Sequence, residues 1–135
     1  MKEVLNFLED NRPFYLATID GDQARVRPMG FVMEFENRLY FGAGNHKAVY
    51  QQMKVNAKVE VCTTASQAPD SPWLRLTGTV VFDERPEVWV AAVKVMPKLA
   101  TMYPETGPTR LAAFYIQDAE AVFHDMKGTV RKVKV

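Results

Sequence analysis

Residues 38–62, RLYFGAGNHKAVYQQMKVNAKVEVC, change their hydrophobic pattern twice within one short stretch. The first six residues, 38–43, are typical of a strand, and the glycines at 42 and 44 indicate a turn at its end. Residues 46–55 place apolar side chains on one helical face, so they predict a helix. KVEVCTTA at 58–65 then alternates apolar and polar residues, as a half-buried strand does. The stretch therefore predicts a strand, a glycine-containing turn, a helix and a second strand.

The rest of the chain adds antiparallel strands on both sides of this unit. Asp-Gly-Asp at 20–22 is a strong turn signal, and Gly78 inside a strand pattern predicts a bulge or bend. Six or so antiparallel strands with three short helices predict a mainly β domain, a small closed or split β-barrel spanning residues 1–135. The expected elements are helices at 2–10, 46–55 and from Pro86 onward, and strands at 14–20, 24–35, 38–43, 58–65, 73–83 and 111–125.

Composition excludes several classes of protein. The 135 residues are 47% hydrophobic and 24% charged with a net charge of +1, so no global charge favours nucleic acid or an anionic membrane. The N-terminal residues lack the apolar core of a signal peptide, no run approaches a bilayer span, and the single Cys62 suits a reducing compartment. We therefore expect a cytoplasmic protein. The tail 127–135 carries four cations and is expected to be solvated and partly frayed, with nucleic-acid contact as a minor alternative.

The turn YFGAGNHK at 40–47 is a candidate phosphate site. Glycines let backbone N–H groups approach a ligand, and a helix N-terminus attracts anions. Lys47 lies in the expected first helical turn, where a cation is unfavourable unless an anion is near. The turn matches neither a Walker A loop nor a full G-x-G-x-x-G. A flexible connection with a solvated lysine is the equal alternative.

Two arginines in the preceding strand form a second candidate. Arg25 and Arg27 are two residues apart, so both guanidinium groups leave the same face of the strand. Such forks match phosphate oxygens. Pro28 cannot donate to a strand ladder, which places this strand at an edge or at a bulge. A pair of exposed hairpin arginines remains the alternative.

Other candidates carry less chemistry. Trp73 begins a strand, where an indole more often packs against a core or interface than against a cofactor. Cys62, His46 and His124 lack the spacing of metal ligands, so no metal site is expected. No serine, cysteine or acidic pattern indicates covalent or hydrolytic catalysis, and no catalytic residue is identified.

Taken together, four segments resemble the FMN-binding split barrels related to pyridoxamine 5'-phosphate oxidase. They are FYLATIDGD, ARVRPMGF, RLYFGAGNHKAVYQQMKVNAKVEVC and WLRLTGTVVF, in this order and with the family's spacing. The resemblance implies a six-stranded split barrel and a homodimer with two FMN sites at the subunit interface.

The resemblance also implies roles for residues of the first strands. Arg27 corresponds to the strand arginine near the flavin phosphate, with Arg25 as a second candidate. Pro28 and Met29 lie where backbone groups border the isoalloxazine ring. Trp73 occupies the place of a glutamine that reaches the flavin of the opposite subunit, so an indole would border the ring instead.

Residues of the glycine turn receive roles in the same way. Phe41 and Gly42 match an aromatic-threonine pair, and the missing threonine removes one hydrogen bond to the phosphate or ribityl chain. Asn45, His46 and Lys47 match a Ser-Arg-Lys run in which the lysine is retained. A histidine in the arginine's place is a weaker, pH-dependent donor.

The function implied is that of a flavoprotein that passes electrons or a hydride through FMN to a small acceptor, with NAD(P)H as a possible donor. The end of the chain lacks the basic segment of true pyridoxamine phosphate oxidases, so vitamin B6 oxidation is not expected. Short members of flavin reductase-like and nitroimidazole-reductase-like type are more similar. A non-catalytic flavin- or haem-binding protein on the same barrel is the alternative, and a structural or nucleic-acid module that uses the basic tail is a third.

Overall fold

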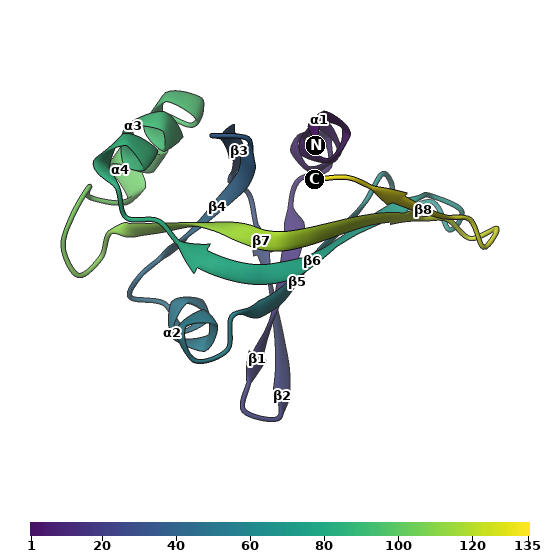
Figure 1. Ribbon diagram of the computed structural model, residues 1–135, viewed down its shortest axis with the longest axis horizontal. Coiled ribbons are helices and arrows are strands. Elements are labelled where there is room, and N and C mark those ends of the chain that lie inside the picture. Colours follow the sequence, from purple (N-terminus) through teal and green to yellow (C-terminus); the bar gives the residue numbers. More distant parts are fainter.

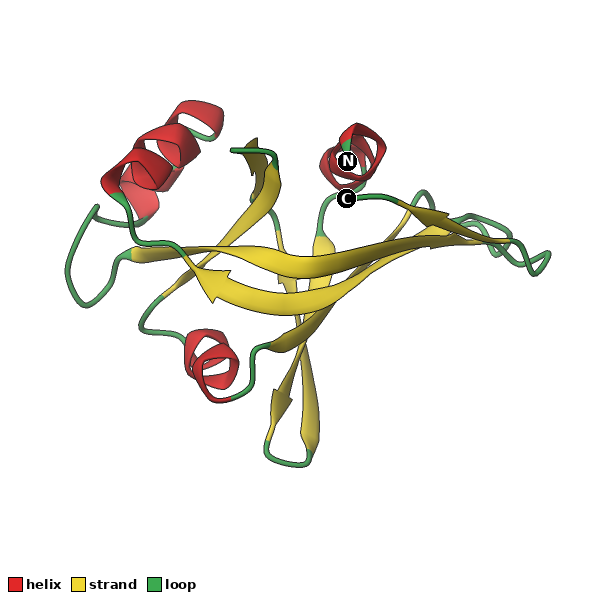
Figure 2. Ribbon diagram, viewed as in Figure 1, coloured by secondary structure: helices red, strands yellow, loops and turns green.

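Eight antiparallel strands form one curved sheet, with four short helices around it (Figures 1 and 2). The computed structural model describes all residues, 1–135. The strands are β1 (Phe14–Asp20), β2 (Gln23–Met29), β3 (Val32–Phe35), β4 (Arg38–Gly44), β5 (Lys58–Thr64), β6 (Trp73–Phe82), β7 (Leu111–His124) and β8 (Val130–Val133). The helices are α1 (Lys2–Asp10), α2 (Ala48–Val55), α3 (Pro86–Val95) and α4 (Leu99–Met102).

The sheet follows the order β2-β1-β5-β6-β7-β4-β3, with β8 paired to β7. β2 and β3 are consecutive in the chain but end the sheet at opposite edges, and they do not pair with each other. The barrel is therefore split rather than closed, which confirms the expected fold class. β2 pairs only with β1, so Pro28 lies in an edge strand as its missing N–H predicts.

The expected single strand 24–35 is wrong, because the chain forms two strands there. Met29 pairs with Phe14, the first residue of β1, so β2 has no partner beyond that point. The chain leaves this ladder at Gly30 and Phe31 and crosses to the far edge of the sheet, where β3 pairs with β4.

The tail is also more ordered than expected. β8 pairs with the end of β7 through a turn in which Asp125 Oδ1 accepts the backbone N–H groups of Lys127 and Thr129, at 2.8 and 3.0 Å. The N-terminal ammonium donates to the Lys134 carbonyl at 2.9 Å. The tail is therefore held by side-chain and backbone hydrogen bonds and is not frayed as predicted. With β8 and the divided strand 24–35, the sheet has eight strands where about six were expected.

The helices differ from expectation at two places. α2 begins at Ala48 rather than at residue 46, so Lys47 is its N-cap residue. A fourth helix, α4, follows Pro97 and lies beside α3 at one end of the sheet (Figure 1). None of the helices has the length and apolar character needed to cross a bilayer.

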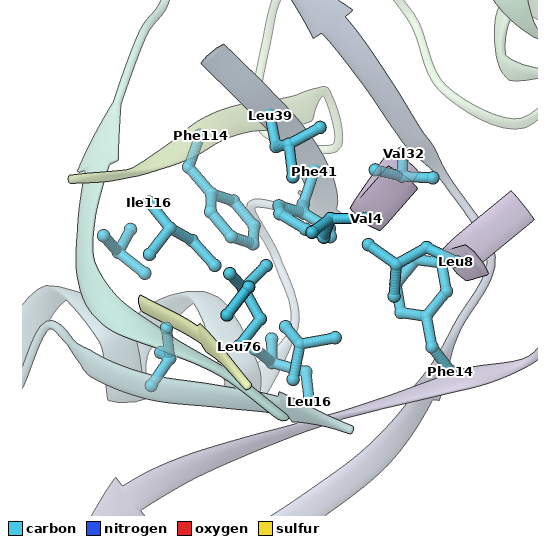
Figure 3. Close-up of a cluster of buried hydrophobic side chains, with 14 of the residues drawn as sticks. Val4, Leu8, Phe14, Leu16, Val32, Leu39, Phe41, Leu76, Phe114 and Ile116 are labelled. Atoms are coloured by element: carbon cyan, nitrogen blue, oxygen red, sulfur yellow. The ribbon is translucent and has the colours of Figure 1, made fainter. Parts of the chain in front are cut away.

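The main core lies inside the curve of the sheet, and Val4 and Leu8 of α1 point into it (Figure 3). Phe41 and Phe114 stack at its centre with ring centroids 5.8 Å apart. Gly78 marks the expected bulge: the register of β6 and β7 shifts between Thr77 and Thr79. A Cβ at residue 78 would lie 2.3 Å from Ile116 Cγ2, so this close approach requires glycine. A second, smaller core packs α3 and α4 against β3, β4 and β7.

Candidate functional site

A cavity of about 280 Å³ lies where β2, β4, the start of α2 and the α3–α4 segment meet. It brings together five of the ten residues that the sequence singled out for cofactor binding: Arg27, Pro28, Met29, Gly42 and Lys47. The two cations come from different elements and are 20 positions apart in the sequence. The other lining residues are Gly30, Phe31, Ala43, Val49, Met96, Leu99, Met102, Tyr103 and Leu111.

Arg27 is held in place by neutral partners. Its Nη1 donates to the Leu16 carbonyl at 3.1 Å and to Thr18 Oγ1 at 2.7 Å, and its Nη2 donates to Gln52 Oε1 at 2.7 Å. Thr18 is buried and donates to the same Gln52 oxygen at 2.6 Å. This network connects β1, β2 and α2, and it fixes the guanidinium at the cavity.

The charge of Arg27 has no carboxylate partner. Three of its five N–H groups are engaged, which leaves the Nε hydrogen and one Nη2 hydrogen for a ligand. Burial lowers the pKa of Arg27, and the nearby charge of Arg25 lowers it further. An anion in the cavity would relieve both effects, because it would stabilise the charged form.

Lys47 supplies the second cation. Its Nζ lies 3.5 Å from the Tyr103 hydroxyl and forms no ion pair with an acid. No side chain caps the N-terminus of α2, whose second residue, Val49, also lines the cavity. The uncapped helix start adds the positive end of a helix dipole to the two side-chain charges.

The absence of acid distinguishes this cavity from others in the chain. None of its lining residues is Asp or Glu. Larger cavities of about 580 and 420 Å³ are each lined by three residues with carboxylate side chains. The cavity of about 420 Å³ also contains two arginines, but both are neutralised by ion pairs: Arg85 with Asp83 and Glu36, and Arg110 with Glu84. Two further cavities, of about 370 and 240 Å³, also contain acid. The acid-free cavity is therefore the one suited to an anion, and its apolar remainder suits a planar ring.

Two predicted residues lie close to this cavity without lining it. Arg25 leaves β2 on the same side as Arg27 but pairs with Asp20 at 3.2 Å. Asn45 ties the turn after β4 to the loop before β7: its backbone N–H donates to Arg110 O at 3.0 Å and its Nδ2 to Gly107 O at 3.2 Å. The buried Asn45 Oδ1 has no partner.

Three further predicted residues are placed elsewhere. Phe41 is 1% exposed and belongs to the main core. The ring of His46 packs over Gly44, where a Cβ would lie 2.7 Å from its Cε1. Trp73 stacks on His124 at 5.3 Å, where β6 begins beside the end of β7, and lines none of the walls of the acid-free cavity.

Sequence reasoning missed the wall formed by residues 96–111. Met96, Leu99, Met102 and Tyr103 come from the α3–α4 segment and its following loop, and Leu111 begins β7. Tyr103 meets Lys47 from 56 positions away, so no local pattern could indicate the contact. No group of three or more His, Cys, Asp or Glu side chains is arranged to hold a metal ion.

Solved structures show the same architecture. A NimC/NimA family protein from Clostridium acetobutylicum is 38% identical with a TM-score of 0.90, and the match covers 100% of this chain and 92% of that one. A putative pyridoxamine 5'-phosphate oxidase from Listeria innocua is 18% identical, with a TM-score of 0.62 and coverage of 99% and 98%. A heme binding protein from Mycobacterium smegmatis is 11% identical, with a TM-score of 0.76 and coverage of 98% and 56%. The last two likenesses concern the fold alone.

No curated protein matches the chain. A sequence model described as pyridoxamine 5'-phosphate oxidase matches residues 1–123. This match covers most of the chain, and the split barrel is the fold expected from it. The chain therefore belongs to the pyridoxamine 5'-phosphate oxidase family.

Proposed function

We propose that this protein is a cytoplasmic, homodimeric FMN-dependent oxidoreductase that passes electrons or a hydride to a small acceptor. The observation that carries the proposal is the pairing of Arg27 and Lys47 in one acid-free cavity beside the uncapped start of α2. Family membership supports a flavin in particular, because this family generally binds FMN, although some members of the fold bind haem.

The donor set fits a phosphate. Arg27 has two free N–H groups and Lys47 has three donors on its ammonium, and phosphate oxygens accept from both kinds of group. Pro28, Met29 and the leucine and methionine side chains of the opposite wall are apolar, as the surroundings of a flavin ring require. When bound, FMN would supply the redox chemistry, and the protein would supply binding, orientation and access.

A second subunit would complete the site. The cavity of about 280 Å³ is at the lower limit of small-molecule sites, which span about 300–1,000 Å³. Exposed apolar side chains gather on the β1–β2 hairpin, where Tyr15, Ile19 and Val26 are 46%, 39% and 68% exposed. Such surfaces commonly mark subunit contacts. In this proposal a homodimer covers the hairpin, and the partner's Trp73 closes the flavin site.

The phosphate assignment is tested by two matched lysine variants of α2. Lys47 borders the cavity, whereas Lys54 lies near the other end of the helix, over the rings of Tyr50 and Phe82. We expect Lys47→Gln to weaken FMN binding about tenfold and to leave riboflavin binding unchanged, because only FMN carries the phosphate. Lys54→Gln should bind both flavins like the wild type. Equal FMN affinity in the two variants would contradict the site.

Turnover is tested separately from binding. Anaerobic bleaching of the bound flavin by NADH or NADPH, followed by recovery of its colour when a nitroimidazole is added, would support an oxidoreductase. A flavin that no reduced nicotinamide bleaches would favour a carrier, and a Soret band in the purified protein would favour haem.

A further inference from the structure

Tyr103 occupies an unexpected position beside the proposed phosphate site. It follows α4 directly, and its side chain lines the acid-free cavity together with Leu99 and Met102. A Cβ at Gly44 would lie 3.0 Å from Tyr103 Cε1, so the ring rests where residue 44 has no side chain. The hydroxyl reaches Lys47 Nζ at 3.5 Å.

The direction of this contact leaves one hydrogen unused. A lysine ammonium has only donors, so the Tyr103 oxygen must accept from Lys47. The hydroxyl hydrogen of Tyr103 is then free to donate, because its contact with Lys47 is the only hydrogen bond that the hydroxyl forms within the chain. An anion that Lys47 binds would lie next to this free O–H group.

We propose that the Tyr103 hydroxyl is a third donor to the phosphate of the bound flavin, beside Arg27 and Lys47. The inference rests on the proposed function. It also supplies a hydroxyl to a site in which Gly42 occupies the place of the family pattern's threonine. A side chain at residue 42 would require the Leu111 side chain to shift, because a Cβ there would lie 2.9 Å from Leu111 Cδ1.

Tyr103 lies at the start of the loop that joins α4 to β7. Asn45 already fastens the far part of this loop to the turn after β4 through Gly107 and Arg110. A phosphate held by Tyr103 and Lys47 would fasten the near part to the start of α2. Ligand binding should therefore restrain the whole segment between α4 and β7.

Two tyrosine variants test this role. Tyr103→Phe removes the donor and keeps the ring, while Tyr115→Phe removes a hydroxyl that lines none of the five cavities described above. Binding of FMN and riboflavin is measured by quenching of flavin fluorescence. We expect Tyr103→Phe to raise the dissociation constant for FMN about tenfold and to leave that for riboflavin unchanged, because a neutral donor to a charged acceptor is lost. Tyr115→Phe should match the wild type.

Limited trypsin digestion gives an independent readout, since Lys98 and Arg110 flank the loop. FMN should slow cleavage at both sites in the wild type and have little effect in Tyr103→Phe. Unchanged FMN affinity in Tyr103→Phe, or equal weakening for both flavins, would overturn the role of Tyr103 while leaving the FMN site intact. Failure of the wild type itself to bind FMN would contradict the proposed function, and this inference with it.

Discussion

Gln52 offers a way to change the charge beside Arg27 without moving any atom of the arginine. Its Oε1 accepts from both Arg27 Nη2 and Thr18 Oγ1, at 2.7 and 2.6 Å. Gln52→Glu retains an oxygen at this place, so all of these hydrogen bonds can persist. The new carboxylate would neutralise the guanidinium from the edge next to the one left free for the ligand. We expect the fold to be at least as stable as the wild type, and FMN to bind more weakly.

The size of the effect follows from geometry. Two anions that bind neighbouring edges of one guanidinium have charge centres about 7 Å apart, and at an effective dielectric constant of about 20 they repel by about 2 kcal/mol. The dissociation constant for FMN should therefore rise about thirtyfold. Riboflavin has no phosphate, and its affinity should change little.

Gln51→Glu is the matched control. Gln51 precedes Gln52 on α2 and is exposed. Both glutamines line the cavity of about 370 Å³, but only Gln52 contacts Arg27. Both variants add one negative charge to the same helix, so a general effect of charge would lower the affinity of both equally. Flavin fluorescence titrations at moderate ionic strength compare them. If Gln51→Glu and Gln52→Glu bind FMN equally well, Arg27 does not hold the phosphate.

Three further predictions concern stability, measured by urea unfolding. The Arg85 guanidinium and the Tyr40 hydroxyl lower the pKa of Asp83 from 3.8 to about 2, so its ionised form stabilises the fold above about pH 4 and this contribution disappears as the pH falls through 2. Asp83→Asn should lower the free energy of unfolding by about 1–2 kcal/mol at neutral pH, allowing for screening at the half-exposed Arg85, and by little below about pH 2. A difference that stays constant with pH would refute the link. Gly78→Ala should lower the free energy of unfolding by about 2 kcal/mol or more, because its Cβ meets Ile116 and the backbone, and an unchanged value would mean that the bulge relaxes. Phe114→Ala should cost about 3–5 kcal/mol by opening a cavity in the main core, and a loss below 1 kcal/mol would mean that the core closes around it.

Much of the fold could be predicted because local signals and tertiary structure agree. The two-residue turn at 21–22, the alternation in β5 and the glycine bulge in β6 all occur as the sequence indicates. The errors at residues 24–35 and at the tail share a cause. Whether residues 24–35 form one strand, and whether the tail pairs, depends on partners distant in the sequence. β1 begins only at Phe14, so β2 has no partner beyond Met29, and β7 extends far enough to pair with β8.

The site was less predictable than the fold. Arg27 and Lys47 could be identified from local chemistry, because a strand arginine and a lysine at a helix start each suggest an anion. Their convergence on one cavity is a finding of the structure, and their role as phosphate ligands stays a prediction. Phe41 was assigned to the site because an aromatic residue precedes Gly42, and packing in the main core also explains an aromatic residue at this position. No sequence motif around Tyr103 indicates a binding site, because the position of Tyr103 depends on how α3 and α4 pack on β4 and β7.

The most direct test of the central claim is the absorption spectrum of the purified protein after incubation with FMN and removal of free flavin. The account predicts flavin bands that remain with the protein, release of FMN on denaturation in a ratio near one per chain, and no such bands after the same treatment with the Arg27→Ala/Lys47→Ala variant. The account would be contradicted by a folded wild-type protein that retains no flavin, or by a double variant that retains as much FMN as the wild type does.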